Sequence, residues 1–80
     1  MQRTDVLDRL QGLFRETFDD DKITVSDRTS ADDVEGWDSL ANVRLMIAVE
    51  HAFCIRVRAA EVASLRNVGE LVNLVVAKAA

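Results

Sequence analysis

The sequence contains no proline, and it has only three glycines and one cysteine among its 80 residues. Proline and glycine are the residues that most disfavour a helix interior, so their scarcity among good helix formers predicts an all-helical chain. The single cysteine, Cys54, excludes an internal disulfide and fits a reducing compartment. The length predicts one domain that spans residues 1–80.

Long apolar runs are also missing: none approaches the roughly 20 residues that a membrane span needs. The N-terminus is charged and lacks the apolar core of a signal peptide, so we expect a cytoplasmic protein. The net charge is −4, with eleven acids and five bases in residues 1–38 and three acids and five bases in residues 39–80. An acidic chain without a dense basic patch is not expected to bind nucleic acid.

Four helices are predicted from apolar residues that recur at three- and four-residue intervals. They cover residues 4–18, 39–53, 59–65 and 68–78. We expect Thr4 to cap the first helix, and Asn67 with Glu70 to form a capping box before the last one. Between the helices, residues 19–38 form a long loop and residues 54–58 a short extended link.

The apolar residues of the two longest predicted helices assign their faces. The first helix presents a stripe of Val6, Leu7, Leu10, Leu13, Phe14 and Phe18. In the second, at about 100° per residue, the arc of Leu45, Met46, Val49 and Phe53 is assigned to the core. Leu40, Val43 and Ile47 fall on a neighbouring arc, which fits either a wider core or a patch where partners dock. Docking is favoured for Ile47.

The stretch Gly36-Trp37-Asp38-Ser39-Leu40 connects the long loop to the second helix. Asp38 is a good N-cap, because its carboxylate can accept from backbone N–H groups that the first turn leaves unpaired. Ser39 then stands at the helix start, in the positive field of the helix N-terminus. A phosphate ester on the Ser39 oxygen would be favoured there, for the same reason that free phosphates bind at such places.

Three other kinds of site are excluded or disfavoured. A serine hydrolase would need a base beside Ser39, but the only histidine, His51, lies twelve residues further along the same helix, about 18 Å away. His51 and Cys54 could approach each other, but two ligands do not make a zinc site. The acidic run at residues 19–21 lacks the alternating ligands, central glycine and final glutamate of a calcium loop.

Asp38-Ser39-Leu40 and the positions that follow resemble the signature of acyl carrier proteins. The further residues that fit are Val43, Leu45, Met46, Ala48, Glu50 and Phe53. The resemblance covers essentially the whole chain, because the length and the spacing of apolar positions on both sides also fit. It implies an all-α bundle of four helices, three longer and a short third one, with a long loop between the first two.

In that family the serine of the motif is esterified with 4′-phosphopantetheine, whose terminal thiol holds acyl groups as thioesters. The resemblance therefore implies that Ser39 is the attachment site, flanked by Asp38 and Leu40. A phosphopantetheinyl transferase would move the arm from coenzyme A to Ser39. The chain is then a monomeric carrier and not an enzyme, and it would serve acyl transferases, synthases or ligases in fatty-acid, polyketide or specialised lipid biosynthesis.

A bundle of this kind can shelter an apolar chain between its second, third and last helices. The candidate lining residues, chosen from their apolar pattern, are Met46, Val49, Ile55, Val62, Leu65, Val68 and Leu71.

The second helix departs from the charge pattern of fatty-acid carriers, which usually present several acids there to basic patches on their enzymes. This helix has only Glu50 as an acid, together with Arg44 and His51. We assign Val43, Arg44, Ile47 and His51 to partner docking. The charges favour a specialised carrier that serves a dedicated pathway.

Two alternatives remain open from the sequence. A peptidyl or amino-acyl carrier domain is related, but such domains usually have Gly-Gly before the motif, where Trp37 stands here. The other alternative is a small helical interaction domain in which Ser39 is not modified. The mass of the protein after incubation with coenzyme A and a transferase separates a carrier from an unmodified interaction domain.

Overall fold

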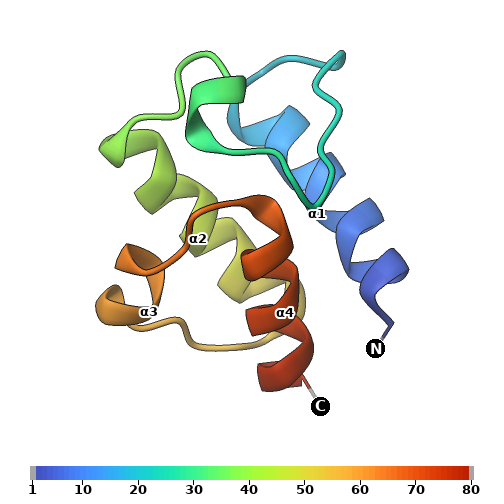
Figure 1. Cartoon of the computed structure of the whole chain (residues 1–80), viewed down its shortest axis with the longest axis vertical. Helices are drawn as coiled ribbons and strands as arrows, with labels where there is room; N and C mark the ends of the chain where they lie inside the picture. Colours follow the sequence, from blue (N-terminus) through green and yellow to red (C-terminus); the bar gives the residue numbers. More distant parts are fainter. Residues whose placement is uncertain (1, 80) are drawn as a thin grey trace.

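The computed structural model describes residues 2–79, and the described chain is helical without any strand. In chain order the elements are α1 (Arg3–Thr17), the 3-10 helix η1 (Ala31–Asp33), α2 (Ser39–Phe53), α3 (Ala59–Ala63) and α4 (Val68–Ala79). Figure 1 shows the three longer helices and the long connection from α1 to α2, which crosses one end of the bundle. The predicted all-α class, with three longer helices and a short third one, is confirmed.

The core lies between α1, α2 and α4, and α1 packs directly against both of the others. It consists of Val6, Leu10, Phe14, Val25, Leu45, Met46, Val49, Phe53, Val68, Leu71, Val72 and Val75. The apolar stripe predicted for the first helix is confirmed, because its members are buried or packed against this cluster. The arc assigned to the core in the second helix is also buried.

The start of α1 differs from the prediction. The helix begins at Arg3 rather than after Thr4, and its N-cap residue Gln2 makes no side-chain capping hydrogen bond. The guanidinium of Arg3 donates to Asp27 at 2.6 Å and to Asn73 at 2.7 Å. These contacts with distant parts of the chain hold Arg3 in the helix, which local capping preferences could not reveal.

The third helix is shorter than predicted and ends at Ala63 instead of residue 65. The Ser64 hydroxyl donates to the carbonyl oxygen of Glu61 at 2.9 Å, and the Leu65 N–H bonds three residues back to Val62 at 3.2 Å. Bonds of this spacing tighten the chain into a 3-10-like turn, which closes the α-helix.

The capping box predicted before the last helix is half right. Asn67 accepts the N–H of Glu70 at 2.9 Å, as expected of an N-cap. The Glu70 carboxylate, however, accepts from the N–H of Arg66 at 2.7 Å and not from Asn67. The reciprocal half of the box is therefore made with the residue before the cap.

The loop between α1 and α2 is fastened to the start of α4. The N–H of Val68 donates to Thr29 at 2.8 Å, and the N–H of Gly69 donates to the carbonyl oxygen of Asp27 at 3.0 Å. A side-chain Cβ at Gly69 would lie 2.7 Å from that oxygen, so only glycine permits this approach. Val25 of this loop is buried in the core and anchors the loop there.

The short helix α3 is tied to the end of α4 by Glu61. The Glu61 carboxylate accepts the backbone N–H of Arg58 at 2.9 Å and forms an ion pair with Lys78 at 3.0 Å. The hydrogen bond from Arg58 and then the interaction with Lys78 lower the pKa of Glu61.

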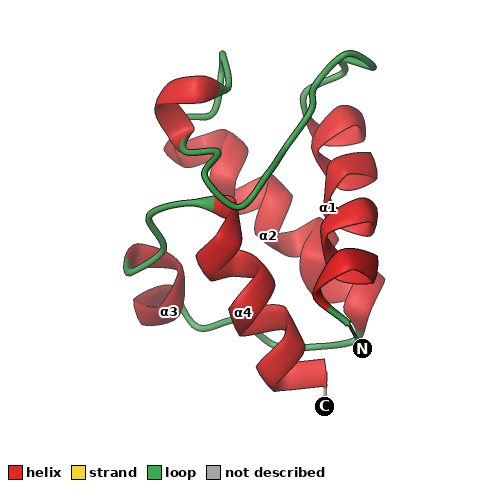
Figure 2. Cartoon of the chain, turned by 45° about the vertical axis from the view of Figure 1, so that its right-hand side comes forward, coloured by secondary structure: helices red, strands yellow, loops and turns green. Residues whose placement is uncertain are grey.

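The two ends of the described chain lie close to the same end of the bundle (Figures 1 and 2). The start of α2 lies toward the opposite end, next to the long loop. Within residues 2–79, no helix is both long enough and apolar enough to cross a bilayer.

Candidate functional site

Ser39 is the first residue of α2, and it is exposed. The carboxylate of Asp38 accepts the N–H of Ala41 at 2.8 Å, so its predicted role as N-cap is confirmed. Gly36 takes a left-handed conformation, with φ of 85°, and turns the chain into the helix. The Ser39 oxygen therefore stands at the positive end of a 15-residue helix.

This serine has no catalytic partner in α2. The helix runs unbroken from Ser39 past His51, so the separation of about 18 Å expected from helix geometry applies. Among residues 2–79, no three His, Cys, Asp or Glu side chains gather as a possible metal site. His51 is therefore too far from Ser39 to act as its base, while the exposed hydroxyl is open to other molecules.

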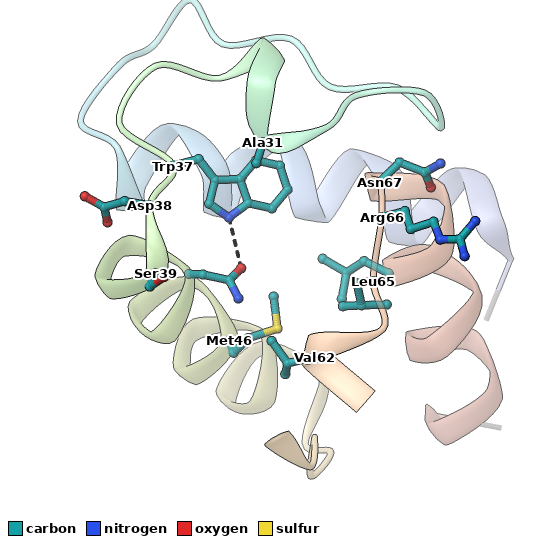
Figure 3. A pocket seen from close by; sticks show the side chains of 11 residues that line it. Ala31, Trp37, Asp38, Ser39, Met46, Val62, Leu65, Arg66 and Asn67 are labelled. Atoms are coloured by element: carbon teal, nitrogen blue, oxygen red, sulfur yellow. Dashed lines mark hydrogen bonds between the residues drawn. The ribbon is translucent and has the colours of Figure 1, made fainter. Parts of the chain in front are cut away.

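Trp37 fixes the approach to Ser39. Its ring packs edge-on against Phe14 at 5.0 Å between ring centroids and lies 6.5 Å from Phe18. Its indole N–H donates to Oδ1 of Asn42 at 2.9 Å, shown as a dashed line in Figure 3. The loop is thus locked to α1 on one side and to the first turns of α2 on the other.

A cavity of about 310 Å³ opens beside Ser39, between the starts of α2 and α4 and the short helix α3. It is lined by Ala31, Trp37, Asp38, Ser39, Asn42, Met46, Val62, Leu65, Arg66, Asn67 and Leu71. Figure 3 shows the Trp37 ring on one side of this space and Leu65 on the other, with the Arg66 guanidinium directed outward. The wall therefore combines apolar side chains with polar ones on both sides, Asn42 near Ser39 and Arg66 with Asn67 toward α4.

Four of the seven side chains predicted to line such a pocket do line this cavity: Met46, Val62, Leu65 and Leu71. The other three do not. Val49 and Val68 are completely buried in the core, and Ile55 lies in a separate surface depression with Cys54. An apolar pattern in the sequence identifies side chains that are removed from water on folding. It does not distinguish those that fill the core from those that line a cavity.

Sequence reasoning missed the polar part of the lining, which includes Asn42, Arg66 and Asn67. Asn42 could have been found, because it lies four residues before Met46 and therefore on the same side of α2. Arg66 and Asn67 reach the cavity through the bend between α3 and α4. No periodic pattern in the sequence predicts that placement.

The face of α2 that points away from the core is apolar along its centre. The exposed fractions of Leu40, Val43 and Ile47 are 66%, 57% and 50%. The wider-core interpretation of these residues is therefore wrong. Arg44 and His51 are exposed on the same helix.

Glu50, the only acid in α2, is directed toward the link that follows the helix. Its carboxylate accepts the N–H of Val57 at 2.8 Å, and its side chain is half-buried. Ile55 and Val57 of this link are partly buried and pack against the core.

A curated relative from Caulobacter vibrioides, an acyl carrier protein, is 32% identical to this chain over 77 residues. The match covers 96% of this chain and 99% of that protein. The chain belongs to the acyl carrier protein family. No family model matches the sequence.

Two solved structures agree with this family assignment. The solution structure of a holo acyl carrier protein from Geobacter metallireducens is 41% identical and superimposes with a TM-score of 0.86, covering 91% of this chain and 84% of that one. An acyl carrier protein from Thermotoga maritima gives a TM-score of 0.83 over 98% of this chain and 91% of that one, and at 24% identity it supports the fold alone. Acyl carrier proteins are carriers and not enzymes.

Cys54 stands directly after α2 in this carrier, with a left-handed φ of 54°. Its side chain is exposed. The backbone N–H groups of Cys54 and Ile55 both bond back to Glu50, so the thiol is held outside the bundle by the way the helix ends.

Proposed function

We propose that Ser39 carries a 4′-phosphopantetheine arm and that the protein holds acyl intermediates on it. The observation that supports this is the position of Ser39. It is an exposed hydroxyl on the first residue of α2 that also lines the cavity. A group attached there can extend into solvent or along the cavity.

The residues around Ser39 fit a phosphodiester. The helix N-terminus favours negative charge, and the carboxylate of Asp38 is engaged with the N–H of Ala41. The bound arm would supply a terminal thiol that holds acyl groups as thioesters. Asp38 and Leu40 frame the attachment point, and the rigid contact between Trp37 and Asn42 keeps the loop in place beside it.

Met46, Val62, Leu65 and Leu71 would receive the apolar part of the cargo, because they are apolar side chains of the cavity wall. The partners that follow are a phosphopantetheinyl transferase, which transfers the arm from coenzyme A, and the acyl transferases, synthases or ligases of one pathway. Fatty-acid, polyketide and specialised lipid biosynthesis are the pathways proposed. The carrier would act as one domain, a cytoplasmic monomer, with residues 1–80 as a unit.

The test is the intact mass of the protein after incubation with coenzyme A, Mg²⁺ and a broad-specificity phosphopantetheinyl transferase. Wild type should gain the mass of one arm. Ser39→Ala should keep the helical circular dichroism spectrum and gain nothing. Ser64→Ala is the matched control, because Ser64 is another exposed serine, outside α2, and it should be modified like wild type. Modification of Ser39→Ala, or refusal of wild type by several such transferases, would leave an unmodified helical domain as the better interpretation.

A further inference from the structure

The outward side of α2 forms one continuous surface, which we call the outer face of α2. It consists of Leu40, Val43, Arg44, Ile47 and His51. At about 100° per residue these five positions fall within an arc of roughly 100° along the helix. The apolar side chains occupy one side of this arc, and His51 and Arg44 occupy the other.

Positive charge continues beyond the end of α2. Arg56 is exposed and shares a surface depression with His51 and Cys54. Among residues 2–79 the side-chain ion pairs are Arg3 with Asp27 and Glu61 with Lys78. Neither Arg44 nor Arg56 belongs to these pairs.

The one acid of α2 lines the same depression as His51 and Arg56, but its carboxylate is engaged with the backbone. Glu50 is half-buried, and its carboxylate is bound to the N–H of Val57. The nearest exposed acid is Asp38, whose carboxylate accepts the N–H of Ala41 as the cap of the helix. Asp32, Asp33 and Glu35 lie further back in the loop before Ser39. The outer face is therefore apolar and basic, although the protein as a whole has a net charge of −4.

We infer that the enzymes which act on this carrier present an apolar depression flanked by Asp and Glu side chains to the outer face of α2. The inference rests on the proposed function, because it concerns partners of the arm on Ser39. Charge complementarity supports this inference. Carboxylates of an enzyme that face Arg44 and Arg56 speed the encounter and favour that enzyme as a partner. An enzyme with a basic docking site is repelled by the same arginines. Leu40, Val43 and Ile47 supply the apolar contact, since their exposure leaves them uncovered in the free protein.

The test uses the holo-protein and a malonyl transferase chosen because Lys and Arg surround its docking site. The measured quantity is kcat/KM for malonyl transfer to wild type and to Arg44→Glu/Arg56→Glu. We expect a gain of roughly tenfold or more in the double variant at low ionic strength. The gain should shrink at about 1 M salt, where the Debye length is about 3 Å. A transferase whose docking bases are replaced by Glu should reverse the preference and favour wild type.

Lys22→Glu/Arg28→Glu is the matched control, because it changes the net charge by the same amount. Both residues are exposed and lie in the loop between α1 and α2, outside the outer face. The control should stay within about twofold of wild type. An equal gain in the control would mean that net charge alone acts, and equal rates for wild type and Arg44→Glu/Arg56→Glu would mean that the face does not select partners. Either result overturns the inference.

Two further measurements separate the remaining outcomes. Intact mass is recorded for each protein before the assay. A protein that does not gain the arm then contradicts the proposal that Ser39 carries it, and not the inference about the outer face of α2. Sedimentation at the assay concentration tests whether the loop acids of a second copy cover this face. Salt-sensitive self-association that Arg44→Glu/Arg56→Glu abolishes would assign the face to a dimer and overturn the inference.

Discussion

The indole N–H of Trp37 donates to Oδ1 of Asn42 at 2.9 Å, which joins the residue two places before Ser39 to the residue three places after it. The Ser39 backbone is thus held from both sides, although its side chain is exposed. The contact also forms part of the cavity wall, so the same bond shapes the place where the proposed arm begins.

Removing this bond should cost stability. Trp37→Phe keeps an aromatic ring against Phe14 but loses the donor, and Asn42→Ala loses the acceptor. Each should lower the free energy of unfolding by about 1 kcal/mol or more. A double-mutant cycle measured by urea denaturation should give a coupling of about 0.5–1.5 kcal/mol. Additive effects in the cycle would show that the bond contributes nothing in solution.

Truncating core side chains should lower the free energy of unfolding more than removing the bond between Trp37 and Asn42. Leu10 is completely buried and Phe53 is 7% exposed, with the guanidinium of Arg9 5.7 Å from its ring centroid. Replacing either residue by Ala should lower the free energy of unfolding by about 2–5 kcal/mol. Leu40→Ala is the control, because that side chain is exposed, and it should change stability by less than about 0.5 kcal/mol. Unchanged unfolding midpoints in both core variants would mean that the helix faces are assigned wrongly.

Two helical glycines should respond to alanine with opposite signs. A Cβ at Gly12 meets nothing within 4 Å, so Gly12→Ala should stabilise the protein by about 0.5–1 kcal/mol through helix propensity. A Cβ at Gly69 would lie 2.7 Å from the carbonyl oxygen of Asp27, so Gly69→Ala should destabilise it by about 1–3 kcal/mol. Thermal unfolding of both variants measures this. Stabilisation by Gly69→Ala would contradict the close approach of the loop to α4.

The contribution of Glu61 should depend on pH. Its pKa is lowered in the folded protein from an ordinary value of 4.5, so its contribution is present above that value and is lost as the pH falls through the folded-state pKa. Glu61→Gln should therefore have a lower Tm than wild type at neutral pH, and the difference should vanish in acid. Glu16→Gln, an exposed acid on α1, serves as the control and should follow wild type throughout. A difference that persists in acid would assign the effect of Glu61 to something other than its charge.

Much of the fold could be predicted from the sequence, because local patterns determine it. The stripe from Val6 to Phe18 and the arc that includes Leu45 identify buried helix faces through their spacing alone. Asp38 was predictable as a cap because capping involves only the next three residues. The placement of Ser39 on an exposed helix start follows from the same local chemistry.

What could not be predicted depends on contacts between distant residues. Arg3 extends α1 because Asp27 and Asn73 lie beside it in space. Glu50 was counted as a surface acid, but it binds the backbone of Val57, which changes the charge that α2 offers to partners. The polar lining of the cavity at Arg66 likewise depends on how the turn after α3 bends.

The arrangement of the chain ends has a practical consequence for handling this protein. Both ends of the described chain lie at one end of the bundle, while the start of α2 lies toward the other. A tether, a fluorophore or a fused enzyme attached near either terminus would therefore stand away from Ser39. A sensor surface that holds the protein by such a tag would orient every molecule with its serine toward the solution, where incoming enzymes can reach it unhindered.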